Sequence, residues 1–159
     1  FPSMTRKTRI IYHIWNRNMN KKVFIDADVI LDLLCQREPH YRYSAEVFTL
    51  GDAGTIELVT TSVVMANIFY ILRKSLGTEK AKALLRKLRI LVGILPVGEK
   101  IIDLALNSHF SDFEDGLQYF TAREHKISIL LTRNARDYRE QDVIILSPEE
   151  YLKSLHEEL

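Results

Sequence analysis

The sequence predicts an α/β domain in which a central, mainly parallel sheet carries helices on both faces. Short apolar segments rich in β-branched residues alternate with longer segments of helical character, which is the pattern of βαβ units. The 159 residues have the size of one domain, and no internal repeat or low-complexity tract divides them. We therefore expect one three-layer α/β/α domain over residues 21–159. Residues 1–20 differ in character and are interpreted as an upstream extension or an adventitious remnant.

Five segments have the short, apolar and β-branched character of buried strands. The strongest signal is the run 127–132, which contains an uninterrupted apolar stretch. A strand of this kind can be buried on both faces of a sheet, as the strands of α/β proteins are. The expected strands cover residues 23–25, 56–60, 94–97, 127–132 and 143–146.

Capping and terminating residues mark the helices between these strands. Asp28 is a suitable N-cap for the first helix, and Pro39 ends it. Gly77 stands just past the end of another helix, and Ser111 with Glu114 has the form of a capping box. The expected helices cover residues 29–36, 41–50, 62–74, 78–92, 99–107, 111–124 and a last helix that starts at 148.

Composition and charge narrow the choice of compartment and partner. No apolar run approaches the roughly 18 residues that span a bilayer, so no membrane partner is expected. The single cysteine, Cys35, cannot form an internal disulfide and fits the reducing cytoplasm, and its apolar neighbours predict that it is buried. The net charge of +1 includes four basic residues within 1–20, so the remainder is net acidic. Contact with nucleic acid would therefore need a local basic patch.

Acidic residues gather at positions that a parallel sheet brings to one edge. Asp26 ends the first strand, Asp137 follows the strand 127–132, and Asp112 and Asp115 share the first turn of a helix. Oxygen ligands suit Mg²⁺ or Mn²⁺, and clustered carboxylates would be costly without a cation. Such ions activate water for phosphodiester hydrolysis. Structural roles stay open: Asp112 also complements the helix dipole, and Asp137 also suits a turn cap.

Three segments resemble the PIN-domain family, best known as the ribonuclease toxins of VapBC-type toxin–antitoxin pairs. The segment 23–32 is similar to the opening strand of the family, with its aspartate. The segment 112–122 resembles its Asp-Ala-Leu-containing helix, and 130–138 resembles the late strand that ends in Thr-Arg-Asn. The resemblance spans about residues 22–152, and the order and spacing of the segments make it fairly specific.

The resemblance implies a metal-dependent endoribonuclease with a PIN-like fold that serves as the toxin of a toxin–antitoxin pair. It implies Asp26, Asp115 and Asp137 as catalytic residues and ligands of Mg²⁺ or Mn²⁺, assisted by Asp112 as a further ligand. The implied partners are RNA, an antitoxin protein and a second copy of the chain. Further side chains are expected to line the site or to hold the RNA backbone: Asn67, Thr132 and Asn134 in the lining, and Arg133 and Arg136 on the RNA.

One departure from the family pattern concerns the helix after the second strand. The family usually places a glutamate there, whereas this sequence has Asn67. An amide offers a neutral oxygen and no charge, so we expect a weaker metal site. The alternative is a catalytically degenerate PIN-like module that binds RNA or protein without cutting. A phosphatase of the haloacid-dehalogenase type is less favoured: Asp26 and Asp28 after a strand suit it, but it needs a placed lysine and a later acidic pair at a strand end.

Overall fold

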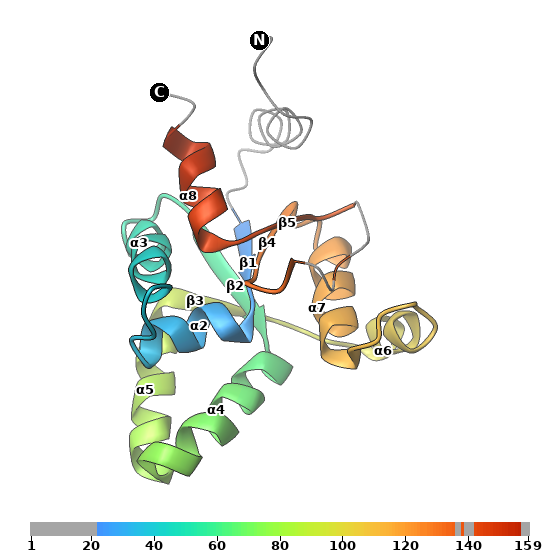
Figure 1. Ribbon diagram of the computed structural model, residues 1–159. Helices are drawn as coiled ribbons and strands as arrows, with labels where there is room; N and C mark the ends of the chain where they lie inside the picture. The colour runs from blue at the N-terminus through green and yellow to red at the C-terminus, as the bar shows by residue number, and fades with distance from the viewer. Residues whose placement is uncertain (1–21, 136–137, 139–141, 157–159) are drawn as a thin grey trace.

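The computed structural model describes residues 22–135, 138 and 142–156 (Figure 1). Within these residues, five strands form one sheet in the order β3-β2-β1-β4-β5, and every neighbouring pair is parallel. β1 is therefore central, and β3 and β5 are the edges. The strands are β1 (Lys22–Ile25), β2 (Glu57–Thr61), β3 (Val92–Leu95), β4 (Ile129–Leu131) and β5 (Ile144–Leu146).

Helices cover both faces of this sheet. Figure 1 shows α6 and α7 on one side, with α2 to α5 on the other. Within the described residues, no helix is long and apolar enough to cross a membrane. The helices are α2 (Ala27–Leu34), α3 (Tyr41–Asp52), α4 (Ser62–Leu76), α5 (Thr78–Leu91), α6 (Glu99–Leu106), α7 (Phe113–Glu124) and α8 (Pro148–His156).

The alternation of side chains along the central strand divides the apolar interior into two cores. Val23 and Ile25 pack into one core with residues of α2, α3, α4, α5 and α8. Phe24 points the other way, into a second core with residues of α6 and α7. All three side chains are at most 2% exposed, so β1 is buried on both faces. The expected three-layer α/β/α architecture and its parallel sheet are confirmed.

The register of the sheet brings the ends of β1 and β4 together. Ile25 pairs with Leu131, and the Asp26 N–H continues the ladder by donating to the Leu131 carbonyl at 3.0 Å. On the other side of β4, the Thr132 N–H donates to the Leu146 carbonyl at 3.0 Å. Asp26 and Thr132 therefore leave neighbouring strands side by side at the carboxyl edge of the sheet.

Some local expectations from the sequence are wrong. The first helix begins at Ala27, and its N-cap is Asp26 instead of Asp28, because Asp26 keeps an extended backbone and accepts from the Ala27 N–H. Cys35 is exposed, since it lies just past the last turn of this helix. The third strand begins at Val92, earlier than expected, because its pairing with β2 starts there. Residues 1–20 lie outside the described residues.

Candidate active site

Asp26 lies at the carboxyl edge of the sheet and has two structural partners. Its carboxylate accepts from the Ala27 N–H and from the Thr132 hydroxyl, the latter at 2.9 Å. Only 7% of the residue is exposed. Burial, together with the negative charges of Asp28 and Asp115, raises the pKa of Asp26 to about 7, although the two hydrogen bonds lower it. Asp26 is thus a buried acid held beside two others.

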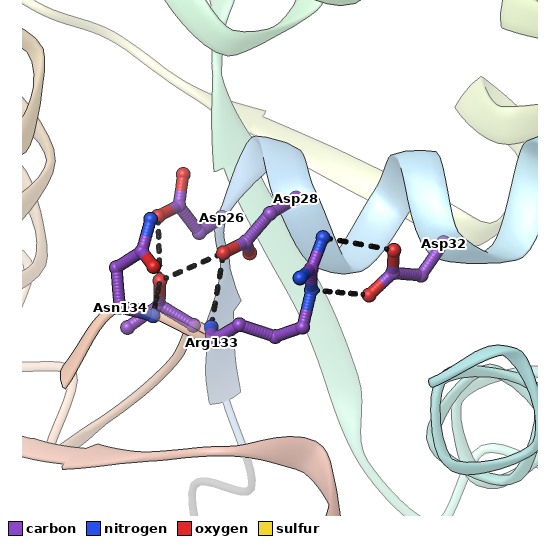
Figure 2. Close-up of polar contacts among 6 residues, drawn as sticks. Asp26, Asp28, Asp32, Arg133 and Asn134 are labelled. Carbon is purple, nitrogen blue, oxygen red and sulfur yellow. Dashed lines mark hydrogen bonds and ion pairs between the residues drawn. The ribbon is translucent and has the colours of Figure 1, made fainter. Parts of the chain in front are cut away.

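Asp28 faces Asp26 from the first turn of α2, and Figure 2 shows it between Asp26 and Arg133. Its Oδ2 accepts from the Arg133 backbone N–H at 3.0 Å and from the Thr132 hydroxyl at 3.3 Å. Its buried Oδ1 has no hydrogen-bond partner among the described residues. Burial is the main cause that raises the pKa of Asp28. In the nuclease interpretation Asp28 was expected only to cap a helix, whereas the structure places its carboxylate beside Asp26.

An ion pair with a buried carboxylate fixes the loop that follows β4. Asp32, fully buried on α2, receives the Arg133 guanidinium through Nε at 2.7 Å and Nη2 at 3.2 Å (Figure 2). The Arg133 side chain keeps 32% of its surface exposed. This two-point contact holds the loop against Asp28. The guanidinium of Arg133 thus has a structural role in binding Asp32. Its contact with RNA stays a prediction.

Removing the Arg133 side chain should destabilise the fold. We expect Arg133→Met to lower the free energy of unfolding by about 3 kcal/mol, because Asp32 would remain buried without its partner charge. Urea denaturation would measure the loss, and the double variant Asp32→Leu/Arg133→Met should recover most of it because both charges are gone. Equal stability of Arg133→Met and the wild type would contradict this account of the pair.

The first turn of α7 brings Asp115 to the site. Asp112 caps this helix by accepting from the Glu114 and Asp115 N–H groups at 2.8 and 3.3 Å. Asp112 itself is exposed, so the structure gives it a capping role, and its part in metal binding stays a prediction. The buried Tyr138 hydroxyl donates to Asp115 Oδ1 at 3.3 Å. Burial, with the charges of Asp26 and Asp115, raises the pKa of Tyr138, so the phenol remains a donor.

Asn67 and Glu114 connect α4 to α7. The Asn67 amide donates to Glu114 Oε2, and the Gln118 amide donates to Glu114 Oε1 at 3.2 Å. The expected capping box is therefore wrong: Asp112 is the N-cap in place of Ser111, and Glu114 reaches Asn67. Glu114 and Gln118 were missed by sequence reasoning. The signal that could have found Gln118 is a polar side chain amid apolar neighbours, and it is 1% exposed.

The remaining expected site residues follow β4. Thr132 is fully buried between Asp26 and Asp28. The backbone N–H of Asn134 donates to the Thr132 hydroxyl at 3.2 Å, while the residue itself is exposed. Arg136 and Asp137 lie outside the described residues, so their expected roles stay predictions. The later acidic pair that a phosphatase would need at a strand end is not supplied by Asp112 and Asp115, which begin α7.

A divalent cation is compatible with the chemistry of these side chains. The donors are carboxylate oxygens, and Asp28 leaves one buried oxygen without a partner among the described residues. Over the same residues, no group of three or more His, Cys, Asp or Glu side chains is already arranged around one point. A preformed cage is not required for Mg²⁺, which keeps several waters and uses one or two carboxylates with substrate phosphate. The residues fit such an ion.

The fold and the site define an α/β domain with an acidic centre at the carboxyl edge of its parallel sheet. The sequence model of the PIN domain matches residues 22–136, more than half of the chain. The chain therefore belongs to the PIN-domain family, as its motifs indicated.

Comparison with individual proteins agrees with this family. The chain is 27% identical over 137 residues to a protein named Ribonuclease VapC1 from Aquifex aeolicus (strain VF5). The matched region covers 83% of this chain and 94% of the relative. Three solved structures, each 16% identical, share its fold.

VapBC2 of Rickettsia felis, bound to a promoter DNA fragment, matches with a TM-score of 0.60 over 79% of this chain and 98% of that chain. A toxin–antitoxin complex from Klebsiella pneumoniae matches with a TM-score of 0.61 over 79% of this chain and 97% of that chain. VapC20 of Mycobacterium tuberculosis, described as a sarcin–ricin loop cleaving toxin, matches with a TM-score of 0.56 over 68% of this chain and 86% of that chain.

Proposed function

We propose that this protein is a divalent-metal-dependent endoribonuclease of the VapC type. The observation that carries the proposal is the burial of Asp26 beside the carboxylates of Asp28 and Asp115. Packing like charges together is unfavourable for folding and is common where a site must bind a cation. Membership of the PIN-domain family and the relative named as a ribonuclease support RNA as the substrate.

Asp26 and Asp115 would hold the ion, and Asp137, which follows β4 in the sequence, is proposed as a further ligand. A bound Mg²⁺ or Mn²⁺ supplies Lewis-acid activation of water and neutralises charge on the phosphate. The protein's own groups position the acids. The Ala27 N–H and the Thr132 hydroxyl orient Asp26, and the Tyr138 hydroxyl holds Asp115. These contacts set both carboxylates before the substrate arrives.

The chemical outcome of cleavage tests this proposal. We expect a mixed set of structured RNAs to be cut with Mg²⁺ or Mn²⁺ and left intact with EDTA. Hydrolysis by water gives a phosphate monoester on one product and a hydroxyl on the other, so mass spectrometry should find no 2′,3′-cyclic phosphate. Cyclic phosphate ends or cutting that resists EDTA would contradict the proposal, because both belong to attack by the RNA 2′-hydroxyl or to a contaminating ribonuclease.

A second candidate function is a PIN-like module that binds RNA or protein without cutting. Asn67 favours it, because the position lacks the glutamate that the resemblance implies. This module would bind the same RNAs at equal affinity with and without metal and leave them intact. Activity that appears only in Asn67→Glu would support this reading over the nuclease.

We also propose that the protein has an antitoxin partner and acts in the cytoplasm. The fold matches structures described as VapBC2 and as a toxin–antitoxin complex, which supports such a partner. A second copy of the chain is a further proposed partner, since symmetric dimers are the commonest oligomers of soluble proteins. Any preparation used for the cleavage assay should therefore be shown to be free of a bound inhibitor.

A further inference from the structure

Glu114 is held by side-chain amides on both of its carboxylate oxygens. Asn67 donates to Oε2 from α4, across 47 residues of sequence, and Gln118 donates to Oε1 from the next turn of α7 at 3.2 Å. Asn67 and Glu114 are partly buried, and Gln118 is 1% exposed. Because both oxygens are held in this way, the carboxylate has a defined place between the two helices.

The same hydrogen-bond network reaches the acidic centre. The Tyr138 hydroxyl lies 3.3 Å from Asp115 Oδ1 and 3.5 Å from the Gln118 side-chain oxygen. Gln118 therefore touches Glu114 with its amide nitrogen and Tyr138 with its oxygen. Glu114 also directly precedes Asp115 in the helical turn that Asp112 caps. The position of Glu114 is thus tied to that of Asp115 through both backbone and side chains.

We propose that Glu114 supplies the metal centre with the carboxylate charge that α4 lacks, and that Asn67 is its positioning residue. A glutamate side chain is one methylene longer than an asparagine side chain. A glutamate at position 67 would therefore carry its carboxylate to about the place where the Asn67 amide now meets Glu114. The charge is supplied from α7 in place of α4. This inference rests on the proposed metal-dependent function and removes the main sequence argument for a degenerate site.

Binding of Mn²⁺ in the absence of RNA tests the inference apart from catalysis. Isothermal titration calorimetry of the full chain with Mn²⁺ would compare the wild type with Glu114→Gln, Asn67→Glu/Glu114→Gln and Asp26→Asn. Glu124→Gln is the matched control, since it removes the same charge from the far end of α7, where Glu124 pairs with the exposed Lys100. Circular dichroism would establish that each variant is folded.

We expect Glu114→Gln to weaken Mn²⁺ binding by about tenfold or more, and Glu124→Gln to change it less than about twofold. The exchange variant Asn67→Glu/Glu114→Gln should bind within about threefold of the wild type, because it returns one carboxylate to the same place. Wild-type affinity in Glu114→Gln, together with lost binding in Asp26→Asn, would overturn the inference and leave the proposed function standing. An exchange variant no better than Glu114→Gln would also overturn it. No Mn²⁺ binding by the wild type would overturn both.

Discussion

Asp26→Asn should slow metal-dependent RNA cleavage by about a thousandfold or more, because the variant loses the charge that holds the ion, and such ions contribute several kcal/mol to the transition state. The fold should survive the change. Asparagine is also a good N-cap, so its side-chain oxygen can still accept from the Ala27 N–H. The Thr132 hydroxyl can rotate to accept from the new amide. Single-turnover rates at saturating enzyme would measure the loss.

The matched control for this variant is Asp52→Asn. Asp52 is exposed at the end of α3, shortly before β2 begins, and so lies toward the amino ends of the strands. The Asp52→Asn variant removes the same charge as Asp26→Asn. Its cleavage rate should stay within about twofold of the wild type, as surface changes away from a site usually have small effects. An Asp26→Asn variant that cuts RNA as fast as Asp52→Asn would rule out Asp26 as an essential acid.

The second large effect concerns the stability of the metal-free protein as the pH rises. The pKa of Asp26 is raised from 3.8 to about 7, chiefly by burial and then by the charges of Asp28 and Asp115. Between these two values the folded protein keeps a proton that the unfolded chain has released. The contribution of Asp26 is therefore most favourable below about pH 4 and is lost as the pH rises through about 7.

Asp26→Asn should remove the free-energy cost of ionising a buried carboxyl in the folded protein at high pH. We expect the metal-free variant to be more stable than the metal-free wild type by about 2–4 kcal/mol at pH 8, with the difference vanishing near pH 4. Urea denaturation of both proteins in EDTA at pH 4, 6 and 8 would measure it, and the comparison at each pH cancels the other acids that titrate in both. A difference that stays the same from pH 4 to pH 8 would show that Asp26 is not a destabilising buried acid.

Much of the fold could be predicted because it rests on local patterns. The apolar strands and their order specify a parallel sheet, and an acid directly after the first strand must lie at its carboxyl edge. Asp26 could be found in this way from its place in the sequence. The start of the first helix was harder to predict, because both Asp26 and Asp28 are good capping residues. The extended backbone of Asp26 decides between them, and local sequence does not reveal it.

The contacts around the site could not be predicted, because they join residues far apart in sequence. Arg133 meets Asp32 across 101 residues, and nothing local to either residue names its partner. Glu114 was misassigned for a different reason, because a local capping-box pattern already gave it a partner within its own helix. The packing of α7 beside α4 gives it a tertiary partner, Asn67, and Asp112 takes over the cap. Local and tertiary uses of one side chain compete, and the packing of the helices decides.

The proposed function depends on the buried acids forming a divalent-metal centre that cuts RNA. The most direct test is to strip the purified, inhibitor-free protein with EDTA and follow cleavage of structured RNA as Mn²⁺ is added back. We expect no cutting without metal and activity that rises and saturates over the range in which Mn²⁺ binds. Cutting that persists in EDTA, or folded protein that binds Mn²⁺ and leaves every RNA intact, would contradict it.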